Sequence, residues 1–117
     1  MSVKIRSVSP VLASLDLNES RLFYTEKLGF ELAEQIENYL MVKRDGFFLH
    51  FWLCDEPHIA ENTSCYIHVE NPLAFFEEFT AKGLNLQAPK IQPWGMIELY
   101  VIDPHGNLIK FGKSASV

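Results

Sequence analysis

The sequence is poor in cysteine, and the spacing of its cysteines excludes the usual roles of clustered thiols. Cys54 and Cys65 each lie in an apolar run, without CxxC spacing and without a cluster of histidines nearby. Zinc sites and disulfide frameworks need several cysteines, or Cys and His at ligand spacing. We therefore expect two buried, reduced thiols.

Long hydrophobic runs and an excess of positive charge are also missing. No apolar stretch approaches the roughly 20 residues of a membrane-spanning helix. Residues 1–4 lack the apolar core of a signal peptide. The net charge of -5 disfavours nucleic acid and anionic membrane as partners. We expect a soluble protein located in the cytoplasm.

Patterns typical of covalent catalysis are absent as well. The chain has no Ser-His-Asp order, no glycine-rich phosphate loop and no setting that would activate a cysteine. Three classes of function stay open: binding of a small molecule, metal-dependent chemistry, and interaction with a protein partner.

Apolar residues, in contrast, are plentiful. They make up 48% of the 117 residues, which is enough to bury a core without metals or disulfides. We expect residues 1–117 to form a single domain.

The clearest pattern is a hairpin near the end of the chain. Two apolar runs, residues 96–102 and 107–111, are joined by Asp103-Pro104-His105-Gly106, a sequence typical of a turn. Both runs alternate, which predicts two different faces. The aliphatic face is suited to helix packing and contains Ile97, Leu99, Val101, Ile109 and Phe111. The other face, with Met96, Glu98, Tyr100, Leu108 and Lys110, suggests a pocket.

The first half of the chain predicts one helix among four strands. Residues 4–15 form a β-branched run broken by Pro10, which favours an edge strand or a strand that ends irregularly. Asp16 and Asn18 offer N-caps for a helix over 19–28, which Gly29 ends. Three further strands are expected at 30–34, 39–43 and 47–53. The buried side of the helix is predicted to contain Leu22, Phe23 and Leu28.

The second half repeats this pattern. A strand over 64–70 precedes a helix with Asn71 as N-cap, Pro72 at its first position and Gly83 past its end. Residues 84–91 have strand character and lead to the hairpin. Leu73, Phe76 and Phe79, widened by Phe75, form the predicted buried stripe of this helix.

This internal repeat predicts an α+β fold of two tandem βαβββ units, at about residues 1–60 and 61–117. Each unit is expected to be a half-open sheet with one helix behind it. With the helices on the outside, the free faces form a cup-shaped mixed sheet. The side chains predicted to bind a planar or aromatic, partly polar ligand there are Tyr39, Phe48, His50, Trp52, Tyr66, His68, Trp94, Glu98, Tyr100 and Lys110.

The histidines permit more than one interpretation. His50 is either a pocket residue or an internal residue with a satisfied hydrogen bond. His50, His68 and Glu98 together form a minority alternative, a non-standard metal site. His58 and His105 lie in loop or turn contexts, where we expect solvent exposure.

Two stretches resemble the vicinal oxygen chelate superfamily, which includes glyoxalase I, extradiol dioxygenases and bleomycin resistance proteins. They are ESRLFYTEKLGFEL early in the chain and QPWGMIELYVIDPHGNLIKFG late in it. The resemblance covers nearly the whole chain. The PWG segment, followed by an acidic residue and DPxGN, is most similar to the bleomycin resistance branch.

The resemblance also implies where a metal would bind in metal-dependent members. Their four ligand positions, occupied by His, Glu or Gln, fall here on Ser9, His50, Ser64 and Lys110. Of these, only His50 is a suitable ligand, and a Lys ammonium repels a cation. The expectation is a protein without metal or other cofactor, and a binding protein is favoured over an enzyme.

The resemblance implies that the protein sequesters a planar or aromatic compound and so confers antibiotic resistance. A cationic ligand would be in keeping with the negative net charge of the chain. Trp94 and Tyr39 would sandwich the planar part of such a ligand. Family members often form homodimers, sometimes by exchange of the N-terminal strand, and residues 7–10 are suited to that role. The alternative is a metal-dependent glyoxalase- or dioxygenase-like lyase or oxidoreductase with a non-standard ligand set.

Overall fold

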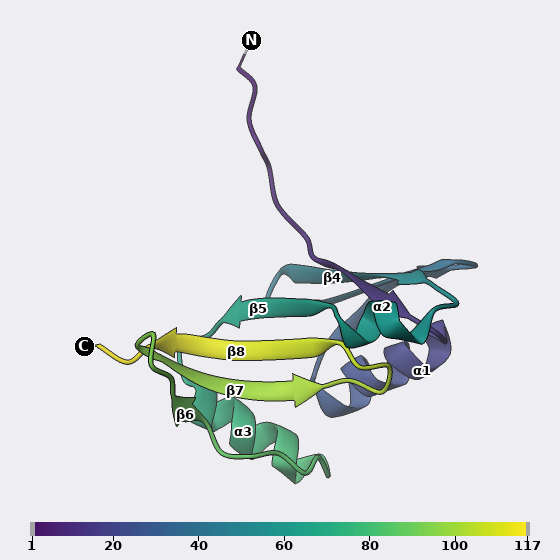
Figure 1. Cartoon of the computed structure of the whole chain (residues 1–117). Coiled ribbons are helices and arrows are strands. Elements are labelled where there is room, and N and C mark those ends of the chain that lie inside the picture. The colour runs from purple at the N-terminus through teal and green to yellow at the C-terminus, as the bar shows by residue number, and fades with distance from the viewer. Residues whose placement is uncertain (1, 117) are drawn as a thin grey trace.

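The computed structural model describes residues 2–116 and contains two four-stranded sheets (Figure 1). The first consists of β1 (Val11–Ser14), β2 (Glu31–Ile36), β3 (Tyr39–Arg44) and β4 (Phe47–Leu53). The second consists of β5 (Ser64–His68), β6 (Lys90–Ile91), β7 (Met96–Ile102) and β8 (Leu108–Ser114).

Both sheets have the same topology. The strand orders are β1-β4-β3-β2 and β5-β8-β7-β6. In each sheet the first strand runs parallel to the last, and the remaining pairs are antiparallel. The predicted α+β fold of two βαβββ units is thereby confirmed.

The long helices begin at side-chain caps that the sequence predicted. The Asp16 carboxylate accepts the N–H groups of Asn18 and Glu19 at the start of α1 (Leu17–Leu22), which continues as a π-helical turn, η1 (Phe23–Lys27). Asn71 caps α3 (Pro72–Ala81) in the same way. A short helix, α2 (Pro57–Glu61), which the sequence did not suggest, connects the units. Among residues 2–116, no helix combines the length and apolar character needed to cross a bilayer.

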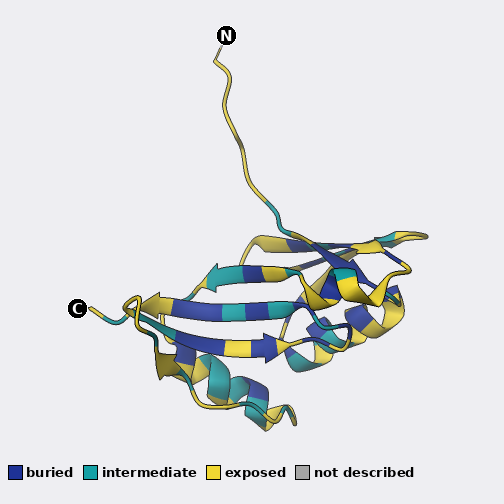
Figure 2. Cartoon of the chain, viewed as in Figure 1, coloured by how far each residue is buried: buried dark blue, intermediate teal, exposed yellow. Residues whose placement is uncertain are grey.

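Helices α1 and α3 lie on the same side of the two sheets and share one hydrophobic core with them (Figures 1 and 2). The core runs through both units, from Leu12 and Phe51 in the first to Phe79 and Phe111 in the second. The hairpin faces are as predicted, since Leu99, Val101, Ile109 and Phe111 are buried. Neither α1 nor α3 covers the opposite, helix-free face of the sheets, and the short α2 packs only beside it, against β1.

The turn between β7 and β8 ties the second unit to the first. One oxygen of Asp103 accepts the N–H groups of His105, Gly106 and Asn107 at 2.9–3.1 Å. Its other oxygen accepts the Tyr24 hydroxyl at 2.7 Å and the Asn107 amide at 2.8 Å. The same amide donates to the Ala13 carbonyl at 2.7 Å, so side chains of the turn reach both β1 and the first helix.

The N-terminal strand is shorter than predicted. Only Val11–Ser14 pair with β4, and the exposed residues 2–8 form an arm that leaves the body of the protein (Figure 1). Pro10 has no N–H to donate to a ladder, although its carbonyl accepts the His50 N–H at 3.0 Å. The strand predicted over 84–91 is likewise reduced to Lys90–Ile91.

Three predictions of burial were wrong. Leu22 and Leu73 are exposed, and Tyr24 takes the buried position in the first helix. The π-helical turn changes the angular spacing after Leu22, so the stripe expected from a regular α-helix does not apply there. His105 is buried, accepting the Leu15 N–H on Nδ1 at 3.2 Å and pairing through Nε2 with Glu19 at 2.6 Å. Cys54 and Cys65 are buried free thiols, as expected.

We expect Tyr24→Phe to destabilise the protein, because it leaves the buried Asp103 carboxylate without its 2.7 Å hydroxyl donor. A lost hydrogen bond to a buried charged group costs about 1.5–3 kcal/mol. Urea unfolding measures the change, with Tyr39→Phe as the matched control on a half-buried hydroxyl. Equal losses for the two variants would contradict the special role of the Asp103 contact.

Candidate functional site

The helix-free face of the second sheet carries a compact polar and aromatic group around Glu98. This carboxylate, on β7, is only 3% exposed. Its Oε2 accepts the Trp94 indole N–H at 3.0 Å, and its Oε1 accepts the Tyr100 hydroxyl at 2.7 Å. Burial alone would raise the pKa of Glu98, but hydrogen bonds from the neighbouring indole and phenols and the charge of Lys110 lower it. The carboxylate is ionised and both of its oxygens are engaged.

Tyr66 completes this group from β5. Its ring packs against that of His68, with centroids 4.9 Å apart, and its hydroxyl lies over Gly112 of β8. Burial and the nearby Glu98 raise the pKa of Tyr66 to about 12. Within the described chain its oxygen is buried without a hydrogen bond of regular geometry. Because a Cβ at position 112 would collide with the phenol, only glycine leaves room for Tyr66.

Lys110 supplies the positive charge of this face. Its ammonium lies 5.4 Å from the centroid of the Tyr100 ring, within the range of a cation–π contact. Among residues 2–116 it has no hydrogen-bond acceptor and no ion-pair partner within 4 Å. On this face, the Lys110 ammonium is therefore a positive charge that no carboxylate of the described residues contacts directly.

A second, smaller group lies on the helix-free face of the first sheet. The Tyr39 hydroxyl and His50 Nδ1 are 2.9 Å apart, and their rings meet edge to face. Trp52 lies opposite Tyr39 in the strand register, and its side chain is partly exposed. Aromatic surface with a polar edge therefore occurs on both sheets, as the alternation predicted.

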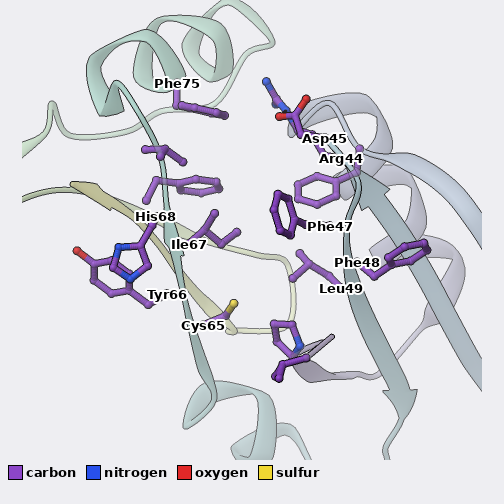
Figure 3. A pocket seen from close by; sticks show the side chains of 15 residues that line it. Arg44, Asp45, Phe47, Phe48, Leu49, Cys65, Tyr66, Ile67, His68 and Phe75 are labelled. Carbon is purple, nitrogen blue, oxygen red and sulfur yellow. Dashed lines mark ion pairs between the residues drawn. The ribbon is translucent and has the colours of Figure 1, made fainter. Parts of the chain in front are cut away.

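A cavity of about 380 Å³ lies between the two sheets, with β4 on one side and β5 on the other (Figure 3). β1 pairs only with His50–Leu53 of β4, and Val8 and Pro10, which precede β1, also line the cavity. Phe48, Tyr66 and His68 are the predicted site residues among its lining. The sequence predicted Phe75 and Phe111 on faces that pack between helix and sheet, and it placed Phe47, Leu49 and Ile67 in strands without a role. All five line the cavity, which the alternation of a strand does not reveal.

A charged cluster closes one end of this cavity. Arg44 makes two hydrogen bonds to the Glu78 carboxylate, at 2.7 and 2.8 Å, and donates to the Leu28 carbonyl at 2.7 Å. Its guanidinium also lies 4.7 Å from the centroid of the Phe75 ring. The hydrogen bond and charge of Arg44 lower the pKa of Glu78 against the effect of burial. These contacts join the first unit to α3 and hold the cavity wall.

The minority metal hypothesis is not supported by the arrangement of its residues. No group of three or more His, Cys, Asp or Glu side chains within residues 2–116 is placed to hold a metal ion. His50 Nδ1 is occupied by Tyr39, and the oxygens of Glu98 by Trp94 and Tyr100. The set of His50, His68 and Glu98 is therefore not brought together. Of the other histidines, His58 is exposed, as expected.

We expect Gly112→Ala to destabilise the protein by about 1–3 kcal/mol, since the new methyl group overlaps the Tyr66 phenol. The cost should largely vanish in a Tyr66→Ala background, because the overlap is then gone. A double-mutant cycle from urea unfolding measures this coupling. Additive effects would show that Gly112 is needed for another reason.

The comparisons with known proteins agree with this geometry. A family model described as glyoxalase superfamily protein matches residues 1–116. A bleomycin resistance protein of Klebsiella pneumoniae is 25% identical, with 87% of each chain covered. One of Geobacillus stearothermophilus is 29% identical, over 87% of this chain and 92% of that protein.

Solved structures show the same fold. The bleomycin-binding protein of Streptomyces verticillus in complex with copper(II)-bleomycin superposes with a TM-score of 0.86 and 28% identity, covering 94% of this chain and 97% of that one. The bleomycin resistance determinant of transposon Tn5 gives 0.84 at 23% identity, with 94% and 98% covered, and supports the fold alone. With its family model matched over almost the entire length, this chain belongs to the glyoxalase superfamily.

Proposed function

We propose that this protein binds and sequesters a bleomycin-type drug, holding its planar part against aromatic side chains of the cup. The observation that carries the proposal is Trp94, a residue that is 61% exposed while its indole N–H is already bonded to Glu98. An indole that offers its face to solvent and keeps its polar edge satisfied is a ready stacking surface. Tyr39, held by His50 on the first sheet, offers a second one.

The relatives support the same function. Two bleomycin resistance proteins match along most of their length, and a similar structure contains copper(II)-bleomycin. The donor set argues for binding rather than metal-dependent turnover. Of the four positions that hold metal ligands in metal-dependent superfamily members, three are Ser9, Ser64 and Lys110 here. Serine is a poor metal ligand, and the Lys ammonium repels a cation.

The ligand-binding form that we propose is a homodimer. Val3, Ile5 and Val8 of the N-terminal arm are 97%, 85% and 83% exposed, a costly arrangement for a β-branched segment in water. On the side of β1, residues 47–49 of β4 lack a partner strand within the described chain. Pairing of one copy's arm with the other copy would cover both surfaces. The reduced thiols and the negative net charge suit the cytoplasm as its location.

We expect Trp94→Ala and Tyr39→Ala each to weaken binding of copper-free bleomycin by about 1–3 kcal/mol, because each removes one stacking face. Calorimetry measures the affinity. Ile36→Ala, at an exposed position of β2, is the control and should bind like wild type. If bleomycin does not bind while a small aromatic acid binds through Lys110, the drug assignment is wrong and an acidic ligand replaces it.

We expect the wild-type chain to sediment as a dimer at micromolar concentration. Replacing both Val3 and Ile5 by Asp should give a monomer, because charged side chains cannot be buried in the interface without a partner. Lys4→Asp with Arg6→Asp is the matched control at alternate arm positions. A monomeric wild type would remove the dimer proposal and leave the drug-binding proposal to its own test.

A further inference from the structure

We propose that Glu98 is a positioning residue, which fixes the Trp94 indole and the Tyr100 phenol before any ligand arrives and makes no ligand contact itself. The effect on ligand affinity rests on the proposed drug-binding function. The restraint on the Trp94 indole in the free protein does not rest on that function. The positioning role and the drug-binding function can therefore fail separately.

The first support is the contrast in exposure between the Trp94 indole and the Glu98 carboxylate. Trp94 is mostly exposed, whereas the carboxylate that holds it is buried. A surface tryptophan without an anchor samples several rotamers. Here the 3.0 Å bond to Oε2 and the 2.7 Å bond from Tyr100 to Oε1 point both aromatic groups at one buried charge. Bonds to a charged acceptor are stronger than neutral ones.

The second support is the backbone around Trp94. The Gln92 N–H donates to Met96 at 2.8 Å, and the Gly95 N–H donates back to Gln92 at 2.9 Å. The Gly95 carbonyl in turn accepts the Ala115 N–H at 2.8 Å. The main chain is therefore fixed on both sides of Trp94. The side-chain torsions are the remaining freedom of the indole, and the bond to Glu98 restrains them.

The third support concerns the charge of Glu98. With both oxygens accepting hydrogen bonds and little exposed surface, the carboxylate is not free to pair with a cationic group of a ligand. With Glu98 only 3% exposed, a cation could reach the carboxylate only if the side chains that cover it moved. The negative charge on this face therefore serves the protein's own aromatic groups. A preset ring also avoids the loss of side-chain entropy that binding would otherwise impose.

The experiment in the free protein uses Trp52→Phe, which leaves Trp94 as the single tryptophan. Time-resolved fluorescence anisotropy should show restricted indole motion, and adding Glu98→Gln should enlarge its amplitude. Glu70→Gln, the same change at an exposed position, should have no effect. Unchanged indole motion in a folded Glu98→Gln variant would overturn the proposal.

The experiment with ligand is a double-mutant cycle with copper-free bleomycin. Glu98→Gln should weaken binding about tenfold, the typical scale of one lost charge-assisted hydrogen bond. Trp94→Phe keeps a ring but removes the N–H, so Glu98→Gln should cost much less in that background. Equal costs in both backgrounds would show direct ligand contact and overturn the positioning role.

Two outcomes need separate controls. If Glu98→Gln does not fold, Trp94→Phe still tests the idea, since this exposed change breaks the same bond and should lose affinity although an aromatic ring is retained. Binding by Trp94→Phe as tight as by wild type would then overturn the proposal. If wild type does not bind bleomycin, the proposed function fails, while the anisotropy of the free protein still decides the role of Glu98.

Discussion

The buried carboxylate of Asp103 is the interaction on which the arrangement of the two units depends. It collects three backbone donors within its own turn and the Tyr24 hydroxyl from the first helix. Asn107 extends the network to the backbone of β1 through Ala13. Buried charge must be fully hydrogen-bonded to be tolerated, so this turn holds the units in one relative position. Because the sheets are fixed, their helix-free faces are fixed as well.

The pair of Arg44 and Glu78 provides a second tie between the units, and Arg44 also lines the cavity. Between the two ties, the core is continuous and apolar. The cavity lies where β1 stops short of covering β4. Residues 2–8, before β1, are exposed, whereas Pro10 still bonds to β4. The exposed arm and the cavity therefore meet at Val8 and Pro10, which belong to the segment before β1 and line the cavity.

Polar groups on the helix-free faces are mostly satisfied by one another. Tyr39 bonds to His50, and Trp94 and Tyr100 bond to Glu98. What remains for a ligand is aromatic surface and the ammonium of Lys110. The fold of the superfamily serves several chemistries, and the fold alone does not choose among them. In this chain the side chains on the free faces favour holding a ligand over transforming it.

Local physics determined much of this protein from sequence alone. Two βαβββ units were predicted from the helix caps at Asp16 and Asn71 and from the repeated order of elements. The faces of the last hairpin were predicted from its alternation. Caps and alternation can be recognised in a sequence because they act over a few residues. Tertiary structure decided what depends on distant partners. His105 is held in the interior by contacts with Glu19 and Leu15, and both oxygens of Glu98 accept hydrogen bonds because Trp94 and Tyr100 turn toward it. The cavity between β4 and β5 likewise exists only once the two sheets are placed, since a sequence period records which way a side chain points but not what lies opposite it.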